Sequence, residues 1–418
     1  MLQKNIYERP KITKCFFRLV INHIILFKIV LKVYFCRAFR DLIRIRSTCE
    51  TMKILNVTSI TELRGGDAQM YTVYNLLKDK SNLKQYILCP EDSVLAGICK
   101  KDNANFFTYK KNKLKLINLV FAIVKICRKE SISIIHIHDS TALNAGLIAM
   151  KFLNKSISLI LSRKRNNGIK NKFLNRYKYS HPSIKKIVCV SKAVEAIFEN
   201  ILPDHERLLT IYDAIDVAKF KDKKSQNLLH KEFNFSSETQ IIGNIAGLTN
   251  QKDIYTFIDT AKKIKDKNNT NLPLKFVLIG EGPLKNDLVT YTKSLHLEND
   301  IFFAGFRKNV TDLLPEFNVF LITSITEGLP LTVYEAFACK VPVVATKAGG
   351  IPEVVSNLET GFVAELKDSE ALSEYVLEIL TNADLKEKIK TNAFNLVQKN
   401  YDLRVMEENY YQFYQSLL

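Results

Sequence analysis

Short β-rich runs alternate with helical runs along most of this chain, and this alternation constrains the fold more than any other feature. It favours parallel sheets whose strands are joined by crossover helices. The chain has 418 residues, which is long enough for two domains with cores of their own. We therefore predict an α/β fold with two Rossmann-like domains facing across a cleft. Ligands of such sheets bind beyond the carboxyl ends of the strands.

The predicted elements divide into two series. The predicted strands are 53–57, 85–89, 132–137, 157–161, 186–190 and 208–212, followed by 240–245, 275–279, 301–303, 319–322 and 343–345. The predicted helices are 68–77, 114–128, 142–152 and 192–199, followed by 254–265, 283–294, 331–339 and 370–380. We expect one domain at 52–220, a second at 221–400, and a last segment rich in Tyr and Phe at 401–418.

Residues 1–51 differ from the rest and form a basic, apolar extension. They contain eleven lysines and arginines but only three acids. The longest charge-free run, 19–27, is too short to cross a bilayer, and no small-residue cleavage site of a secretory signal follows it. Three interpretations stay open: a basic amphipathic helix on an anionic membrane surface, a misassigned start upstream of Met52, or other structure.

The net charge of +18 suggests anionic partners, either phosphorylated substrates or an anionic lipid surface. A lysine-rich composition without such a partner is the alternative. The sequence has no zinc-finger spacing, RNA-recognition signature or helix-turn-helix context, so nucleic acid is not expected. The eight cysteines form no C-x-x-C pair, which is typical of reduced core residues in a cytosolic protein.

The segment from Thr326 to Glu335 carries the strongest chemical signal. Glu327 and Glu335 are eight positions apart, and the first lies on a turn between a strand-like and a helix-like run. Glu335 follows about two helical turns later. A helix that starts here points free N–H groups at an anion. Two acids beside a phosphate site suit a sugar linked to a nucleotide diphosphate, although a βα turn with two solvated acids remains the simpler alternative.

Polar groups follow several other predicted strands. Gly65-Gly66 allows close backbone approach to a phosphate or sugar, and a plain turn is the alternative. His136 and His138 alternate to one face of their strand, and a third metal ligand is lacking, so no metal site is expected. Arg163 and Arg165 could bind a phosphorylated or carboxylated acceptor, or form a solvated loop. Ser191 is expected to cap the helix that follows it.

Together these motifs resemble the E-x7-E signature and glycine turns of the retaining glycosyltransferases of family 4, which have the GT-B fold. The strings Gly280-Glu-Gly-Pro283, Ala304-Gly-Phe306 and Ala348-Gly-Gly-Ile-Pro-Glu353 also match this family. The resemblance implies that residues 52–220 bind the acceptor, that 221–400 bind the nucleotide sugar, and that 401–418 form a helix returning to the first domain. It also implies a metal-independent enzyme without a cofactor.

The resemblance further assigns individual roles. Glu327 is expected to bind sugar hydroxyls and stabilise the oxocarbenium face, Lys252 to hold the leaving diphosphate, and His138 to contact the donor sugar. Glu335 would accept hydrogen bonds from the ribose. The remaining donor-binding candidates are Gly65, Gly66, Gly328, Leu331, Thr332, Gly280 and Gly282.

One position departs from the family pattern. Gly247 stands where members usually have an Arg that contacts the diphosphate, and Arg307 or Arg163 could compensate by charge. We expect a UDP-sugar donor and a cell-envelope glycan or lipid-linked acceptor, in the cytoplasm or on the inner face of the cytoplasmic membrane. A nucleotide-sugar 2-epimerase of the same fold and a non-catalytic nucleotide-sugar-binding protein are the alternatives. The oligomeric state is not indicated.

Overall fold

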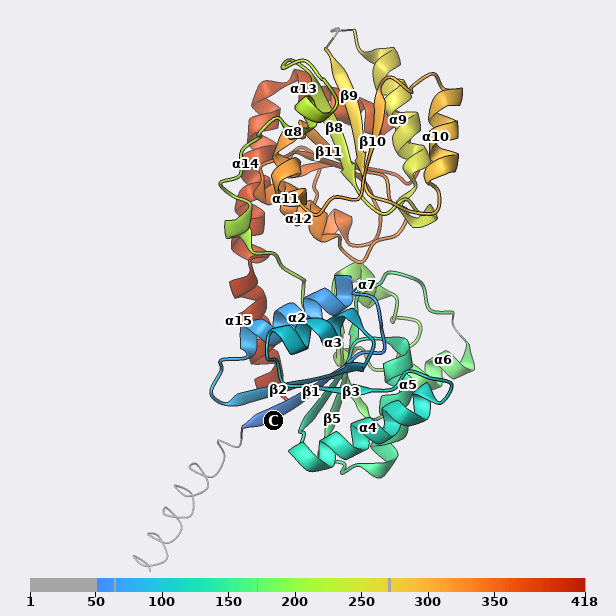
Figure 1. Ribbon diagram of the computed structural model, residues 1–418, viewed down its shortest axis with the longest axis vertical. Coiled ribbons are helices and arrows are strands. Elements are labelled where there is room, and N and C mark those ends of the chain that lie inside the picture. The colour runs from blue at the N-terminus through green and yellow to red at the C-terminus, as the bar shows by residue number, and fades with distance from the viewer. Residues whose placement is uncertain (1–50, 64, 171, 270–271, 418) are drawn as a thin grey trace, which may run out of the picture. The chain divides into compact units, whose positions relative to one another are not determined.

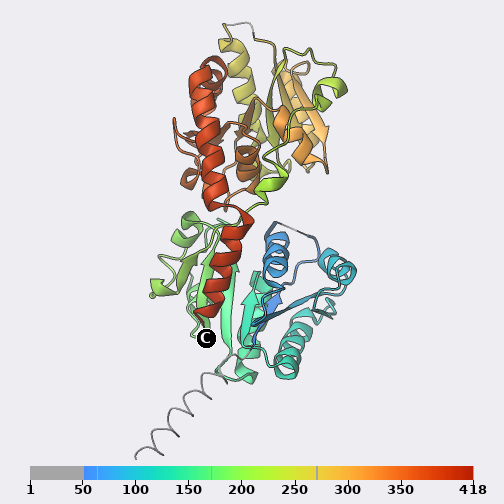
Figure 2. The ribbon, with the colours of Figure 1, turned by 90° about the vertical axis from the view of Figure 1, so that its left-hand side faces the viewer.

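The computed structural model describes residues 51–63, 65–170, 172–269 and 272–417. Residues 53–418 form one compact unit, built around two parallel sheets (Figures 1 and 2). The predicted basic extension lies, up to residue 50, outside the described residues. None of the helices in the described part is long and apolar enough to cross a membrane.

The first sheet has seven parallel strands in the order β3-β2-β1-β4-β5-β6-β7. Its order reverses beside β1, the strand that opens the sheet, and such a switch point is where open α/β sheets bind ligands. The strands are β1 (Met52–Val57), β2 (Leu83–Pro90), β3 (Phe106–Tyr109), β4 (Ile134–Ile137), β5 (Ser158–Arg163), β6 (Ile184–Cys189) and β7 (Leu208–Thr210).

The second sheet has six parallel strands in the order β10-β9-β8-β11-β12-β13. Here the order reverses beside β8, so the loops that follow β8 and β11 lie next to each other at the carboxyl edge. The strands are β8 (Gln240–Ile245), β9 (Leu274–Ile279), β10 (Ile301–Gly305), β11 (Val319–Ile322), β12 (Val343–Thr346) and β13 (Gly361–Ala364).

Helices pack on both sheets and bury near-continuous apolar strands, as parallel sheets require. The part of the chain that forms the first sheet and its helices is called the first half, and the part that forms the second sheet is called the second half. The helices of the first half are α2 (Gly65–Leu77), α3 (Val94–Lys101), α4 (Lys115–Glu130), α5 (Ser140–Ala149), α6 (Phe173–Tyr179) and α7 (Lys192–Ala196). In the second half they are α8 (Leu228–Glu232), α9 (Ile254–Lys267), α10 (Lys285–Ser294), α11 (Val310–Leu313), α12 (Leu331–Ala338), α13 (Ser369–Thr381) and α14 (Ala383–Asn400), before the last helix, α15 (Leu403–Gln415). The predicted fold class is confirmed.

The last helix, α15, packs against the first sheet's elements rather than the second sheet's (Figures 1 and 2). Its Tyr411 donates a hydrogen bond to Asn82 at 3.0 Å, and Glu407 pairs with Lys80 at 2.7 Å. Further along, the Tyr414 hydroxyl lies 2.7 Å from Nδ1 of His136, on β4. The aromatic residues of the C-terminus therefore become part of the first half's core.

Several elements differ from the sequence prediction. The strands β3 and β13 and the helices α3, α6, α8, α11 and α14 were not predicted. β3 and β13 are only four residues long, and β13 begins with Gly361, which has low strand propensity. In addition, α12 begins at Leu331, so Glu335 is its fifth residue and lies in the second turn, closer to the helix start than predicted.

Candidate active site

Two loops at the carboxyl edge of the second sheet bring Lys252 and Glu327 together. The loop after β8 is tied to the loop after β11 because Ile325 N–H donates to the Gln251 carbonyl at 2.9 Å. Thr323 adds a bond from its hydroxyl to the Asp253 carbonyl at 2.9 Å. As a result, Nζ of Lys252 lies 2.5 Å from Oε1 of Glu327, whose side chain is only 11% exposed.

Helix α12 begins three residues beyond Gly328, and its N-terminus carries no side-chain cap. The cap position is Pro330, which has no N–H and no hydroxyl or carboxylate to offer. The first N–H groups of a helix lack intrahelical acceptors, and the dipole adds partial positive charge there. The N–H groups of Leu331 and Thr332 therefore form a potential anion site beside the Lys252–Glu327 pair.

Glu335 is a half-buried carboxylate on the same helix. It makes no hydrogen bond or ion pair with any residue that the structure describes. Burial raises the pKa of Glu335 to about 7, because the charged form loses water without gaining a partner. A carboxylate whose pKa is raised in this way is expected where a ligand supplies the missing hydrogen bonds.

Gly328 connects the second-sheet loop to the first half. A Cβ built on Gly328 would lie 2.3 Å from the Lys164 carbonyl oxygen, so only glycine allows this approach. The Gly328 carbonyl accepts bonds from the Ser191 hydroxyl at 2.9 Å and from Gly350 N–H at 3.0 Å. Gly349, with φ +56°, packs on the Glu327 backbone, where a Cβ would lie 1.8 Å from the carbonyl oxygen. These contacts hold the Glu327 turn from both sides.

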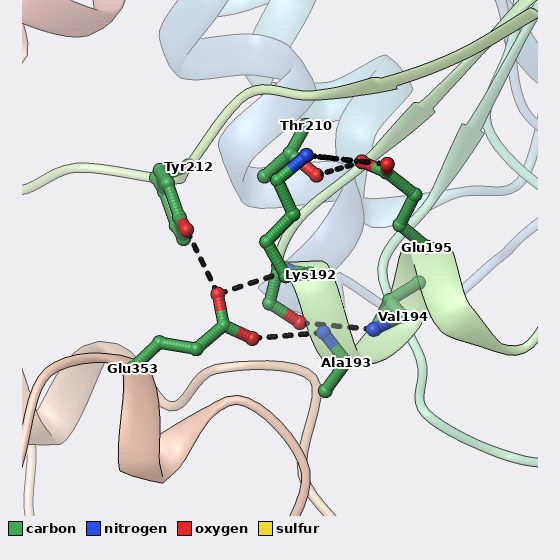
Figure 3. A network of polar contacts seen from close by, with 8 residues as sticks. Lys192, Ala193, Val194, Glu195, Thr210, Tyr212 and Glu353 are labelled. Atoms are coloured by element: carbon green, nitrogen blue, oxygen red, sulfur yellow. Dashed lines mark hydrogen bonds and ion pairs between the residues drawn. The ribbon is translucent and has the colours of Figure 1, made fainter. Parts of the chain in front are cut away.

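Glu353 makes a second connection, shown in Figure 3. Its carboxylate accepts hydrogen bonds from the backbone N–H groups of Lys192 and Ala193, at 2.9 and 2.8 Å. The Tyr212 hydroxyl donates a third bond at 2.8 Å. Ser191 caps the same helix by accepting from Val194 N–H at 3.2 Å, which confirms its predicted role. The Glu353 carboxylate, which belongs to the second half, thus provides hydrogen-bond acceptors for the first N–H groups of α7 in the first half.

The first half contains a cavity of about 370 Å³ at the carboxyl edge of its sheet. Gly65, Gly66, His138, Arg163 and Arg165 all line it, so the structure brings these predicted residues together. Glu327, Lys252 and Glu335 are not among its lining residues. Arg163 donates to the Asn167 carbonyl at 2.7 Å, while its buried Nε has no partner among the described residues.

A chain of amide groups sets the tautomer of His138. Gln85 Nε2 donates to the Tyr74 carbonyl at 3.0 Å, so its Oε1 accepts from Asn56 Nδ2 at 3.3 Å. Asn56 Oδ1 therefore faces His138 Nε2 at 3.1 Å and accepts a hydrogen bond from its N–H group. This leaves Nδ1 of His138 as a buried acceptor without a partner among the described residues.

His136 on β4 and His138, which directly follows this strand, are expected to be neutral near pH 7. Burial, His136 and Lys164 hold the pKa of His138 well below its usual value, and burial followed by Lys164 lowers the pKa of His136 to about 3. Their rings share one face of the strand, as predicted, with centroids 4.4 Å apart. Asp139 is not available to a metal, because its oxygens accept bonds from Ser59, Thr141 and Ala142.

Lys164 is a polar residue of the site that sequence reasoning did not single out. Its ammonium pairs with Asp213 beneath the cavity, and its side chain is 14% exposed. Burial lowers the pKa of Lys164, but the charges of Asp213 and Tyr410 and the hydrogen bonds to both residues together outweigh burial and raise it. This lysine lies in the sequence between the two arginines, Arg163 and Arg165, that were predicted to bind the acceptor.

The turn with Gly280 and Gly282 lies against the loop after β8. Gly280 has φ +144°, and Leu248 N–H donates to the Glu281 carbonyl at 3.0 Å. Gly247 is in this loop, and a Cβ there would meet nothing closer than 3.7 Å, so sterics do not exclude a side chain. Of the proposed substitutes, Arg307 forms an ion pair with Glu232.

Comparison with known proteins places these motifs in a family. The model described as glycosyl transferases group 1 matches residues 225–396, and the model described as Glycosyltransferase Family 4 matches residues 82–219. The N-acetyl-alpha-D-glucosaminyl L-malate synthase of Bacillus anthracis is 23% identical over 305 residues, covering 72% of this chain and 79% of that protein. The UDP-Gal:alpha-D-GlcNAc-diphosphoundecaprenol alpha-1,3-galactosyltransferase of Escherichia coli is 23% identical over 377 residues, with coverages of 85% and 96%.

The solved structure of Anabaena HepE in complex with UDP superposes with a TM-score of 0.76 at 18% identity, covering 87% of this chain and 100% of that one. This likeness supports the two-sheet GT-B fold. The two family models together match about three quarters of the sequence. The chain therefore belongs to the family 4, group 1 glycosyltransferases and is a glycosyltransferase enzyme of the GT-B fold.

Proposed function

We propose that this enzyme transfers a sugar from a UDP-sugar to a lipid-linked or glycan acceptor of the cell envelope, with retention of the anomeric configuration. One observation carries the proposal. Lys252 and Glu327 form a pair beside the uncapped start of α12, and the half-buried Glu335, which has no polar partner among the described residues, follows on the same helix. The names of the Escherichia coli relative and of the Anabaena complex, which both include UDP, support the choice of nucleotide.

The diphosphate of the donor binds at the N-terminus of α12 in this proposal. The N–H groups of Leu331 and Thr332 donate to the phosphate oxygens, and Lys252 supplies a full positive charge. Since the leaving group gains negative charge in the transition state, these groups stabilise the transition state more than the ground state. They provide the charge that some transferases obtain from a metal, so we propose metal-independent catalysis without a cofactor.

The two glutamates bind the two sugars of the donor. Glu335 accepts hydrogen bonds from the ribose hydroxyls, which supply the hydrogen-bond donors that its half-buried carboxylate lacks among the described residues. When the donor binds, the Lys252–Glu327 ion pair separates and Lys252 contacts the diphosphate. Glu327 then accepts hydrogen bonds from hydroxyls of the transferred sugar and stabilises the positive charge that develops on this sugar in the transition state. His138 contributes from the first half, because its free Nδ1 can accept a hydrogen bond from a sugar hydroxyl.

The bond changes occur on one face of the transferred sugar. The acceptor oxygen forms a bond to the anomeric carbon on the same face from which the diphosphate leaves, while the bond from that carbon to the diphosphate oxygen breaks. The leaving phosphate oxygen takes the proton of the acceptor hydroxyl. This front-face course is proposed because no side chain has been identified as the nucleophile of a double displacement.

The acceptor binds in the 370 Å³ cavity of the first half. Arg163 and Arg165 line this cavity, and Arg163 retains an unpaired, buried Nε. A guanidinium in this position suits the phosphate or carboxylate of an acceptor. A diphosphate-linked lipid provides such a group, which agrees with an acceptor presented at the inner face of the cytoplasmic membrane.

A donor screen followed by product analysis tests the proposal. Purified enzyme is mixed with UDP-, GDP- or ADP-sugars, and its thermal unfolding is measured, since a donor at 100 times its Kd adds about 2.7 kcal/mol to the free energy of unfolding. The stabilising donor is then incubated without acceptor, and the first anomer of the released sugar is identified by NMR. We expect UDP-sugars to stabilise and the retained anomer to appear first. An inverted anomer, or interconversion of the donor to its epimer, would contradict the proposed reaction.

A further inference from the structure

Positive charge is concentrated in one part of the chain. Residues 103–194 contain nineteen lysines and arginines but only two acids, Glu130 and Asp139, so this segment has a net charge of +17 within a total of +18. From residue 140 to residue 194 there is no acid at all. The segment forms α4, α5 and α6 of the first half. Such a field attracts anionic surfaces over a Debye length of about 8 Å at physiological salt.

Helix α4 exposes large apolar side chains within this basic segment. Leu114, Ile117 and Phe121 are spaced three and four residues apart, so they share one side of the helix, and Phe121 is 71% exposed. The opposite side, with Leu119 and Ile123, is fully buried against the sheet. The helix is therefore apolar on both sides, and a packed core explains only one of them.

Helix α6 shows the same combination more strongly. Phe173 is 80% exposed and Leu174 is 76% exposed, and Tyr177 one turn later is also mostly exposed. Lys172 and Arg176 are exposed beside them. The helix turns Tyr179 inward, where it is buried and lines the proposed acceptor cavity.

The two helices are joined through α5. Helix α4 packs against α5, and Lys178 of α6 donates hydrogen bonds to the carbonyl and hydroxyl of Ser140, the first residue of α5, at 3.1 and 2.7 Å. Figure 1 shows α4, α5 and α6 grouped along one side of the first sheet. The two helices that expose apolar side chains thus both contact α5 on the same side of the first sheet.

We infer that α4 and α6 form a docking surface for an anionic lipid bilayer. This docking surface consists of Leu114, Ile117, Phe121, Phe173, Leu174 and Tyr177 with Lys113, Lys115, Lys172 and Arg176. The apolar side chains enter the boundary between headgroups and acyl chains, while the cations contact anionic headgroups. This inference rests on the proposed function and deepens it. Tyr179, on the buried side of α6, lines the proposed acceptor cavity, so the docking surface and the cavity share one helix.

Charge decides between this occupant and others. In a symmetric dimer the basic segment of one copy, with its net charge of +17, would face the same segment of the other, and residues 1–51 carry a net charge of +8, so both occupants would be repelled by the docking surface. A nucleic acid would complement the cations. It would leave the two most exposed side chains, Phe173 and Leu174, without a matching apolar partner.

Vesicle sedimentation with the full chain tests the inference. The probes are vesicles of phosphatidylcholine alone and of phosphatidylcholine with about a third phosphatidylglycerol. We expect binding to the anionic vesicles that weakens with salt, and at least roughly tenfold weaker binding for Phe173→Ser/Leu174→Ser. The matched control is Leu358→Ser/Leu366→Ser, which removes two exposed leucines in the second half and should bind like the unmodified protein.

A charge-matched pair completes the test. Replacing Lys113, Lys115, Lys172 and Arg176 by Gln should weaken binding roughly tenfold or more, whereas replacing Lys308, Lys367, Lys388 and Lys399 by Gln leaves the same net charge and should have little effect. Circular dichroism shows that the variants fold, and donor hydrolysis without vesicles shows that they keep the proposed chemistry. Neither measurement depends on the docking surface. Equal vesicle binding by all variants, or displacement from vesicles by duplex DNA at equal phosphate, would overturn the inference while leaving the transferase proposal intact.

Discussion

The ammonium group of Lys252 lies 2.5 Å from the carboxylate of Glu327 in the protein without donor. Each group therefore neutralises the charge of the other. In the proposed complex the lysine turns to the diphosphate and the glutamate turns to the transferred sugar. The two residues should consequently fail in different ways when they are replaced.

Glu327→Gln should reduce kcat strongly while UDP still binds. The amide keeps the size of the side chain but cannot stabilise the positive charge on the sugar, so we expect a loss of about 2–4 kcal/mol of transition-state stabilisation. UDP affinity should be unchanged or higher, because Lys252 no longer has a competing partner. Steady-state kinetics and UDP titration by calorimetry measure the two effects. Lys252→Gln should instead weaken UDP binding, and a Glu327→Gln enzyme with full kcat would refute the assigned role.

The pH dependence of donor binding should report Glu335. Its pKa of about 7 in the free protein is above the ordinary value because of burial, and the ribose hydroxyls favour the ionised form. Below pH 7 the donor can bind only after this proton is lost, so donor affinity should fall by up to about tenfold per pH unit, and it should be flat above pH 7. Titration of UDP between pH 5.5 and 8.5 measures this. A flat profile would remove Glu335 from the ribose site.

Stability should change in the opposite sense at the same residue. Between pH 4.5 and 7 the folded protein holds a proton on Glu335 that the unfolded chain has already lost, so stability falls as the pH rises through this window. Above pH 7 the cost reaches about 3 kcal/mol, from roughly 1.4 kcal/mol per pKa unit. Glu335→Gln should therefore raise the free energy of unfolding at pH 8 but not at pH 4.5, as urea denaturation can measure.

Gly247→Arg should increase activity. The residue lies in the loop that also carries Lys252, and a Cβ built there meets no atom closer than 3.7 Å, so the substitution needs no backbone shift. A guanidinium added beside the diphosphate would stabilise the leaving group, with an expected gain of about tenfold in kcat/KM. Gly247→Gln is the control for the added bulk. If both variants lose activity equally, the proposed diphosphate position is wrong.

Glu353 and Tyr212 should be energetically coupled. The Tyr212 hydroxyl donates to the same carboxylate that accepts from the start of α7, and burial followed by Glu353 raises the pKa of this tyrosine. A double-mutant cycle with Glu353→Gln and Tyr212→Phe should give a coupling of about 1–2 kcal/mol in the free energy of unfolding. Additive effects would show that the hydrogen bond is absent in solution.

Local patterns were sufficient for the fold class and for much of the candidate site. The alternation of His136 and His138, the cap at Ser191 and the turn at Glu327 depend on neighbours within a few residues, and the structure shows each of them. Tertiary partners were beyond the sequence. Lys164 meets Asp213 across 49 positions, and Glu353 meets Lys192 across 161, so no spacing rule could link them.

The substrate preference of the donor site could depend on a residue that touches no substrate. Gln85 orients Asn56, and Asn56 in turn holds the proton of His138 on Nε2. Nδ1 of His138 can therefore only accept a hydrogen bond, so it favours a hydroxyl over a carbonyl or ether oxygen at the sugar position that it faces. If His138 contacts the donor sugar as proposed, reversing the amide chain at Gln85 would turn this nitrogen into a donor, so a buried strand residue would set the hydrogen-bond preference of the site.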